Sequence, residues 1–207
     1  NKTDDYAYDT CEYNVNEIKR LAKIGFELAM KRSKKLCCID KANVLETSRL
    51  WRQTVQSLEK NYPEVNVSYE FVDAVAMRLI HSPSYYDVLI TSNLFGDILT
   101  DEASVISGSM GLMPSASVGV ETSIYEPIHG SFPQAKGKNI ANPLATILSA
   151  SMMFERSFHL NQESKLIRDL VNESISNNIV TKDLSGDGKS FKTAEVGDWI
   201  VERIIKG

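Results

Sequence analysis

The sequence predicts a protein of the α/β class, and three observations lead to this prediction. Short apolar runs with the length of strands alternate, almost throughout the chain, with longer stretches that have the period of amphipathic helices. Apolar residues make up 43% and charged residues 24% of the 207 residues, an ordinary balance for a globular protein. No internal repeat or low-complexity tract interrupts this order. We therefore expect an α/β fold with a substantial hydrophobic core.

The first half of the chain is predicted to hold three strands separated by helices. Residues 14–33 carry the apolar stripe of an amphipathic helix. Arg32, Lys34 and Lys35 close this helix, because positive charges are favourable at the negative carboxyl end of a helix dipole. The later elements are a buried strand at 36–39, a helix at 48–60, an alternating strand at 65–72, a short helix at 74–81, an apolar strand at 87–91 and a helix from 97 to 105.

A break between two lobes is predicted at residues 107–114, where two glycines and a proline occur within eight residues. We therefore expect one lobe at residues 1–107 and another at 108–207. The second lobe is predicted to contain a strand-like segment at 123–125, a long loop at 126–142, and helices at 143–155, 163–176 and 194–205, the last with Thr193 as its N-cap.

Charge and composition exclude several classes of partner. The net charge is −4, which argues against nucleic-acid and anionic-membrane partners. No apolar run is long enough to cross a bilayer, and the chain does not open like a signal peptide. The cysteines are Cys11, Cys37 and Cys38, an odd number with two adjacent in an apolar run. They predict reduced thiols in the core of a cytoplasmic protein.

The beginning of the chain is polar and does not start with methionine. We expect residues 1–8 to be poorly ordered. We also expect a natural N-terminal portion to precede them.

Acidic residues gather around the last helix of the first lobe. Asp97 and Asp101 stand four residues apart, which places them on one helix face, and Glu102 is adjacent. Like charges at this spacing destabilise an isolated helix by a few tenths of a kcal/mol, roughly, so a hard divalent cation could offset them. An acidic first turn that favours the helix dipole is an equal alternative.

Two further charged residues follow predicted strands. Lys41 comes just after the strand at 36–39, at the edge where sites form in parallel α/β folds, so it could act as a general base. Taken alone, it is better explained as a surface lysine with a packed stem. Asp73 follows the next strand and offers a third carboxylate or an ordinary capping group.

The loop at 126–142 is rich in glycine, proline and lysine and includes His129, whose ring could stack on a base. It has neither a Walker nor a Rossmann phosphate pattern. It is either a long surface loop or a binding loop, and long loops without regular structure are often functional.

Several motifs, taken in order, resemble the β-decarboxylating dehydrogenase family and in particular its isopropylmalate branch. They run from about residue 8 to the carboxyl end, and their number makes the resemblance specific. The motifs are DKANVLE at 40–46 with LWR at 50–52, VDA at 72–74 with AM at 76–77, NLFGDILTD at 93–101, GSMGLMPSA at 108–116, EPIHGS at 126–131 and IANP at 140–143.

The resemblance implies a two-lobed fold that lacks its N-terminal portion here. Residues 1–107 would form the central dimerisation and catalytic lobe, and 108–207 part of the cofactor-binding lobe. Tyr13 matches the tyrosine that protonates the enol, and Lys41 matches the general base. Asp73, Asp97 and Asp101 match the ligands of Mg²⁺ or Mn²⁺. Lys41 and Asp73 would reach into the active site of the partner subunit, which implies a homodimer with shared sites.

The resemblance also implies a nicotinamide cofactor. Asn43 and Val44 match residues beside the nicotinamide and substrate, and the adenosine-binding positions are His129, Gly130, Ser131 and Asn142. Members that use NAD usually carry an acid where this chain has Gln134, and that acid repels a 2′-phosphate. We expect NAD, with NADP as the alternative. Phe132 also replaces a small residue, so the adenine pocket should be reshaped.

The implied activity is oxidative decarboxylation of the 2-hydroxy acid 3-isopropylmalate to 2-oxo-4-methylpentanoate, in leucine biosynthesis. The substrate-binding arginines of the family lie outside this chain, so we expect no turnover from this part alone. Isocitrate, homoisocitrate and tartrate are alternative substrates. A non-catalytic dimerisation module is the alternative of another class, and the length of the native gene would decide between them.

Overall fold

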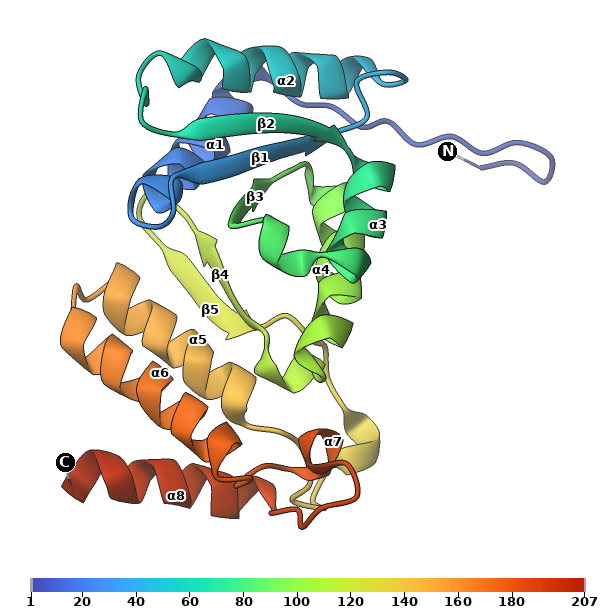
Figure 1. Ribbon diagram of the computed structural model, residues 1–207. Helices are drawn as coiled ribbons and strands as arrows, with labels where there is room; N and C mark the ends of the chain where they lie inside the picture. Colours follow the sequence, from blue (N-terminus) through green and yellow to red (C-terminus); the bar gives the residue numbers. More distant parts are fainter. Residues whose placement is uncertain (1, 207) are drawn as a thin grey trace. The chain divides into compact units, whose positions relative to one another are not determined.

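The computed structural model describes residues 2–206 and divides into two compact units (Figure 1). The first unit extends to Ala103 and the second begins at Ser104, so the division falls within helix α4 (Asn93–Ser107). The break predicted after Ser107 lies at the carboxyl end of that same helix.

The first unit is built on a parallel three-stranded sheet in the order β2-β1-β3. Successive side chains of β1 point to opposite faces of the sheet, and both faces are covered by helices, as parallel sheets require. The elements are α1 (Val15–Met30), β1 (Lys35–Asp40), α2 (Glu46–Glu59), β2 (Asn66–Phe71), α3 (Val72–His81), the 3₁₀ turn η1 (Pro83–Tyr85) and β3 (Val88–Ile90).

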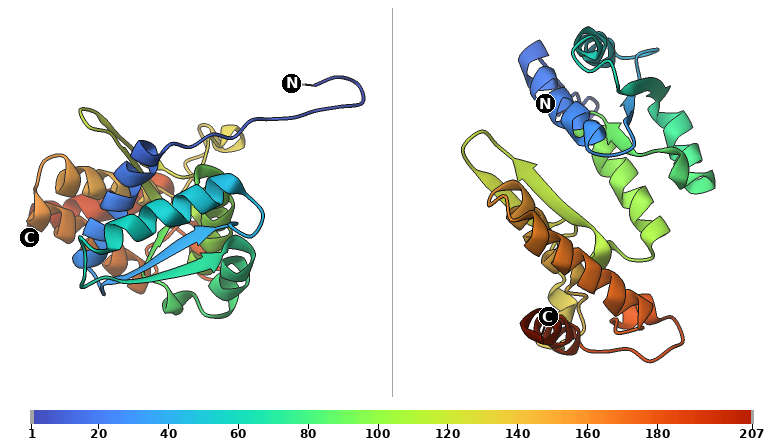
Figure 2. Two further views of the ribbon diagram at one scale, coloured as in Figure 1. Left: turned by 90° about the horizontal axis from the view of Figure 1, so that it is seen from above. Right: turned by 60° about the vertical axis from the view of Figure 1, so that its left-hand side comes forward.

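Two hydrophobic clusters lie on the two faces of this sheet. Leu36 and Cys38 face α1 and α2, which lie side by side over the strands (Figure 2). Cys37 and Ile39 face the opposite way and pack with Val75, Leu79 and Leu99 of α3 and α4. This alternation explains why residues 36–39 form a continuous apolar run in the sequence.

Helix α1 begins and ends where local interactions dictate. The Asn14 side chain accepts hydrogen bonds from the amides of the first turn, and Glu17 reaches back to the Asn14 amide, which completes a capping box. The helix ends at Met30, before the predicted residue 33. A Cβ at Gly25 would come within 2.5 Å of the Ile90 side chain, so this glycine permits the close packing of α1 on β3.

Helices α3 and α4 both begin earlier than the sequence predicts, and this changes the place of two acids. Strand β2 ends at Phe71, so Asp73 lies in the first turn of α3 and not at the end of a strand. Helix α4 begins at Asn93, so Asp97 is beyond the first turn, which holds no acid. Asparagine and glycine in this stretch are poor helix formers, which explains why it resembles a turn in the sequence. The dipole explanation for Asp97 is correspondingly weakened.

The second unit combines an antiparallel hairpin with a stack of helices. The hairpin packs on α5, α5 packs on α6, and α6 packs on α8. Buried residues of α5, α6 and α8 form the core. The elements are the 3₁₀ turn η2 (Met110–Leu112), β4 (Pro114–Val118), β5 (Ser123–Pro127), the 3₁₀ turn η3 (Pro133–Ala135), α5 (Leu144–Arg156), α6 (Asn161–Ser176), α7 (Lys182–Ser185) and α8 (Thr193–Lys206).

Three features of this unit differ from the predictions. Strand β4 and the short helix α7 were not expected, because small polar residues hide the first and a polar loop surrounds the second. Thr193 is the first residue of α8 and donates its hydroxyl to the Ala141 carbonyl at 2.5 Å. The Asn139 side chain instead accepts from the Ala194 amide at 2.9 Å. The helix start is thus tied to the 126–142 loop.

The cysteine prediction is correct for two residues and wrong for the third. Cys37 and Cys38 are buried free thiols, whereas Cys11 is exposed. Burial raises the pKa of Cys37 to about 11 and also raises the pKa of Cys38. At the amino end, Lys2 and Ala7 form a single bridge in an exposed turn; Asn1 lies outside the described residues. None of the helices within residues 2–206 has the length and apolar character needed to span a membrane.

Candidate functional site

Lys41, which follows β1, and Asp73, in the first turn of α3, are in direct contact. The Lys41 Nζ atom donates to Asp73 Oδ1 at 2.5 Å, and the ammonium lies 5.8 Å from the centre of the Phe71 ring. This hydrogen bond holds the pKa of the Asp73 carboxyl below its usual range. The structure therefore brings the predicted base together with one predicted metal ligand.

Tyr13 precedes α1 and lies against two other elements of the first unit. Its hydroxyl oxygen accepts a hydrogen bond from the Asn93 amide at 3.3 Å. Its ring meets the buried Trp51 ring edge-on, with 5.6 Å between the ring centres. The phenol of the predicted acid is thereby held at the amino-terminal end of α4.

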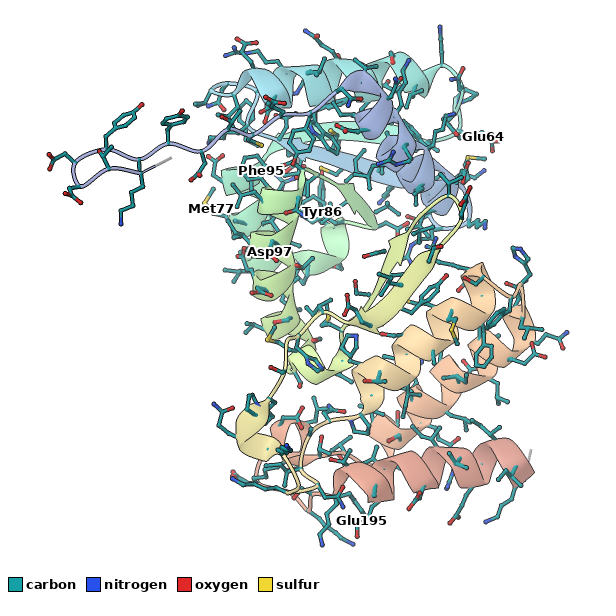
Figure 3. The ribbon with its side chains drawn as sticks, turned by 180° about the vertical axis from the view of Figure 1, so that it is seen from behind. Glu64, Met77, Tyr86, Phe95, Asp97 and Glu195 are labelled. Carbon is teal, nitrogen blue, oxygen red and sulfur yellow. The ribbon has the colours of Figure 1, made fainter. Side chains whose placement is uncertain are left out.

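Asp97 and Asp101 are both exposed and lie one turn apart on α4. Figure 3 labels Asp97 on α4 and Met77 on the neighbouring helix α3. Within residues 2–206, no three histidine, cysteine, aspartate or glutamate side chains form a cluster able to hold a metal ion. A single chain therefore does not bring Asp73 together with the acids of α4 into one complete site. The donor set itself suits Mg²⁺ or Mn²⁺, because these cations prefer carboxylate oxygens.

Asn43 and Val44 lie in the exposed turn between β1 and α2. The Lys41 carbonyl accepts hydrogen bonds from the amides of Val44 and Leu45, both at 2.9 Å. Val44 is 61% exposed, which leaves an apolar side chain available for contact beside Lys41. This position is compatible with the role the resemblance implies.

The second unit contains a pocket of about 640 Å³, a volume within the range of about 300–1,000 Å³ that ligand pockets occupy. Four predicted adenosine-binding residues line it, whereas Gln134 is exposed and does not. Phe132 lines it as well, with 57% of its surface exposed. The lining residues are Ser109, Met110, Gly111, His129, Gly130, Ser131, Phe132, Ile140, Ala141, Asn142, Lys182 and Asp183.

Asp183 is a pocket residue that the sequence did not reveal. One carboxylate oxygen accepts from the Ser109 hydroxyl and from Asn142 Nδ2 at 3.0 Å, and the other accepts from the Thr181 hydroxyl at 2.5 Å. Burial favours the neutral acid, but these hydrogen bonds outweigh it and lower the pKa of Asp183. One side chain thus joins η2, the loop before α5 and the start of α7.

Gly111 explains how Asn142 can approach this network. A Cβ at Gly111 would lie 2.6 Å from the Asn142 Cβ, closer than side chains tolerate. The Gly111 amide donates to the Ser109 hydroxyl at 3.0 Å, and Leu144 donates its amide to Asn142 Oδ1 at 2.9 Å. The glycine in the predicted break is therefore part of a pocket wall.

A model of the isocitrate/isopropylmalate dehydrogenase family matches residues 1–200. The chain belongs to this family. Since the match covers nearly the whole chain, it includes both the Lys41–Asp73 contact and the pocket of the second unit.

Curated relatives of this family member are named 3-isopropylmalate dehydrogenase. The protein from Bacteroides fragilis is 57% identical over 203 residues, which cover 98% of this chain and 57% of the relative. The protein from Clostridium acetobutylicum is 49% identical over 200 residues, covering 96% of this chain and 56% of the relative. The chain thus spans a little over half the length of these relatives.

Solved structures confirm the predicted α/β fold. An isocitrate dehydrogenase from Methylococcus capsulatus superposes with a TM-score of 0.91 at 34% identity, covering 98% of this chain and 61% of that one. A β-decarboxylating dehydrogenase from Thermococcus kodakarensis gives a TM-score of 0.87 at 32% identity, covering 100% and 60%. The family member described here therefore has part of that fold.

Proposed function

We propose that this chain is the catalytic and adenosine-binding part of an enzyme that oxidatively decarboxylates 3-isopropylmalate to 2-oxo-4-methylpentanoate. The enzyme would be cytoplasmic and would serve leucine biosynthesis. The observation that carries the proposal is the 57% identity to a protein named 3-isopropylmalate dehydrogenase over 98% of this chain. The Lys41–Asp73 contact supports it, because it supplies a candidate base beside a candidate metal ligand.

Each proposed catalytic residue has a defined task. The amine of Lys41, once it has released its own proton, accepts the proton of the substrate hydroxyl. The phenol of Tyr13 delivers a proton to carbon after carbon dioxide has left. Asp97 and Asp101, with Asp73 of the partner subunit, would hold Mg²⁺ or Mn²⁺, which when bound polarises the hydroxyl and carboxylate oxygens of the substrate.

The pocket of the second unit is the proposed site of the adenosine half of the cofactor. His129 Nδ1 lies 3.0 Å from the Gly130 carbonyl, which orients the ring at the pocket wall. A Cβ at Gly130 would meet nothing within 4 Å, so this backbone is open to a ligand. We propose NAD, which when bound accepts hydride from the substrate carbon. NADP is the alternative, because Gln134 carries no repelling charge.

The proposed homodimer follows from an exposed apolar face on α3 and α4. Met77 and Ile80 of α3 are 69% and 71% exposed, and Leu94 and Ile98 of α4 are 62% and 57% exposed. Asp73 stands one turn before Met77, so the same face would bring Lys41 and Asp73 toward the partner subunit's Asp97. A structure in which Lys41 lies near only its own chain's Asp97 would contradict this arrangement.

Activity assays of the protein at its full natural length test the proposed reaction. With NAD and Mn²⁺, 3-isopropylmalate should be oxidised with a higher kcat/KM than isocitrate, homoisocitrate or tartrate. A higher kcat/KM for one of the other acids would leave the proposed mechanism unchanged but would identify a different substrate. Dimers without turnover of any of them, from a native gene no longer than this chain, would instead indicate a dimerisation module.

A further inference from the structure

An ion pair with a buried carboxylate precedes Lys41 in the first unit. Asp40 is 1% exposed, and Arg52 of α2 donates to both of its oxygens, Nε to Oδ2 at 2.8 Å and Nη2 to Oδ1 at 3.0 Å. A buried carboxylate is stable only where it is paired and hydrogen-bonded, and this two-point geometry satisfies both needs. The pair therefore joins the end of β1 firmly to α2.

The same carboxylate fixes the backbone that carries Lys41. Asp40 Oδ1 also accepts from the Ala42 amide at 2.9 Å, and the Lys41 amide donates to the buried Ser48 hydroxyl at 3.0 Å. The amides of Lys41 and its successor are therefore both bonded to side chains that are themselves held in place. The turn has little freedom while the ion pair is intact.

Two aromatic rings of β2 contact the side-chain cations of Arg52 and Lys41. The guanidinium carbon of Arg52 lies 5.5 Å from the centre of the Tyr69 ring and 5.3 Å from that of Phe71. The Lys41 ammonium lies 5.8 Å from the Phe71 ring, so one ring contacts both cations. Because Asp40 neutralises Arg52, a second cation can lie on this ring without an uncompensated like charge.

We propose that Asp40 and Arg52 are positioning residues that hold Lys41 in the orientation it needs to reach Asp73 and the substrate hydroxyl. The inference rests on the proposed role of Lys41 as the base. Arginine is required at position 52, because lysine has one ammonium and cannot bond both carboxylate oxygens in parallel. Neither residue touches the substrate in this proposal.

The test compares Arg52→Met and Arg52→Lys with a matched control in the protein at its full natural length. Arg78 provides that control, because it pairs with Glu70 at 2.8 Å and lies over the Tyr85 ring at 4.4 Å. Both Arg52 variants should lower kcat by about 10²-fold with KM changed little, since a misplacement of about 1 Å can cost that much. Arg78→Met should keep the wild-type kcat, even if it loses as much folding stability as the Arg52 variants do.

Amide hydrogen exchange at Ala42 supplies a readout that does not depend on turnover. Exchange should be at least about tenfold faster in Arg52→Met and unchanged in Arg78→Met and Lys41→Met. Unchanged exchange at Ala42 in Arg52→Met, or equal kcat losses in the Arg52 and Arg78 variants, would overturn the proposal.

Lys41→Met separates the failure of this inference from the failure of the proposed function. Loss of hydride transfer in Lys41→Met, together with full kcat in Arg52→Met, would reject only the positioning role. Full hydride transfer in Lys41→Met would reject the base, and the positioning role with it.

Discussion

The hydroxyl of Tyr13 accepts a hydrogen bond from the backbone amide of Asn93, the first residue of α4, across 3.3 Å. The proposed acid is thereby attached to the helix that carries Asp97 and Asp101. Lys41 is held separately, by the turn after β1 and by its contact with Asp73. Since different elements place the two groups, their loss should affect different steps of the reaction.

Replacing each of these two groups should therefore give a different kinetic defect. In Lys41→Met the burst of reduced nicotinamide should disappear, because no amine accepts the hydroxyl proton during hydride transfer. In Tyr13→Phe part of the burst should remain while steady turnover falls by about 10²–10⁴-fold, the range typical of general acid–base groups. Stopped-flow absorbance of the nicotinamide distinguishes the two. A full burst in Lys41→Met would exclude lysine as the base.

Asp97→Asn should weaken binding of Mn²⁺ in the presence of substrate by at least about tenfold, because a neutral amide replaces a charged ligand. Glu102→Gln is the control, since Glu102 lies on the same helix but turns away from the face of Asp97 and Asp101. Calorimetric titration of Mn²⁺ measures both variants. Equal affinity in Asp97→Asn and the wild type would leave Asp97 without a metal-binding role.

The order of strands and helices in the first unit could be predicted from the sequence, because the hydrophobic pattern of each segment matches the element it forms. The apolar run at Cys37 and Cys38 has the length and character of a strand covered on both faces, and it forms one. The start of α4 was predicted four residues late, at Asp97 and not at Asn93, because Asn93 and Gly96 have low helix propensity. The Tyr13 hydroxyl bonds the first amide of that helix, and no local pattern announces a partner 80 residues away.

In the second unit the sequence singled out residues that line the pocket but not the side chain that supports them. His129 and Asn142 line the pocket, and their motifs were visible in the sequence. Asp183 was missed because it lies in a polar stretch that resembles any surface loop. Most of its signal was long-range: Thr181 is two residues away, but the Ser109 and Asn142 donors lie 74 and 41 residues away and reach the carboxylate only after folding.

Gln134→Asp should shift cofactor choice toward NAD. A carboxylate at this position would repel a 2′-phosphate and could accept hydrogen bonds from the ribose hydroxyls. The ratio of kcat/KM for NAD to kcat/KM for NADP should rise in Gln134→Asp and stay near the wild-type value in the neutral control Gln134→Asn. An unchanged ratio in Gln134→Asp would place the discrimination at another residue.

Thiol labelling should distinguish Cys11 from the two cysteines of β1. In the folded protein Cys11 should react with a maleimide, because it is exposed. Cys37 should not react, because it is 4% exposed and its raised pKa of about 11 leaves little thiolate at neutral pH. Mass spectrometry should find one label before denaturation and three after it. Labelling of Cys37 at the rate of Cys11 would contradict the burial of β1.

Because of Asp183, the free energy of unfolding of the second unit should decrease as the pH falls into the acid range. Its pKa is lower in the folded protein than its usual value, so the folded state favours the carboxylate. The sign follows from linkage: the stabilisation is fully present above the unfolded-state pKa near 4, roughly, and is lost as pH falls through the lower folded-state pKa. Asp183→Asn should remove this dependence, because an amide oxygen cannot replace a carboxylate that accepts from three donors.

The measurement is chemical unfolding of wild type and Asp183→Asn at several pH values. At pH 6 the free energy of unfolding of the variant should be lower by about 1 kcal/mol. This value is low for hydrogen bonds to a charged group, because the Asp183 side chain is exposed to solvent, which screens its charge. Towards pH 3 the difference should shrink, since protonated Asp183 loses the same stabilisation in the wild type. The carboxyls of Asp73 and Asp87 also have lowered pKa values and titrate in this window, but they are common to both proteins. The difference between the two unfolding curves therefore isolates Asp183, and a difference that stays constant from pH 6 to pH 3 would show that its charge does not stabilise the pocket.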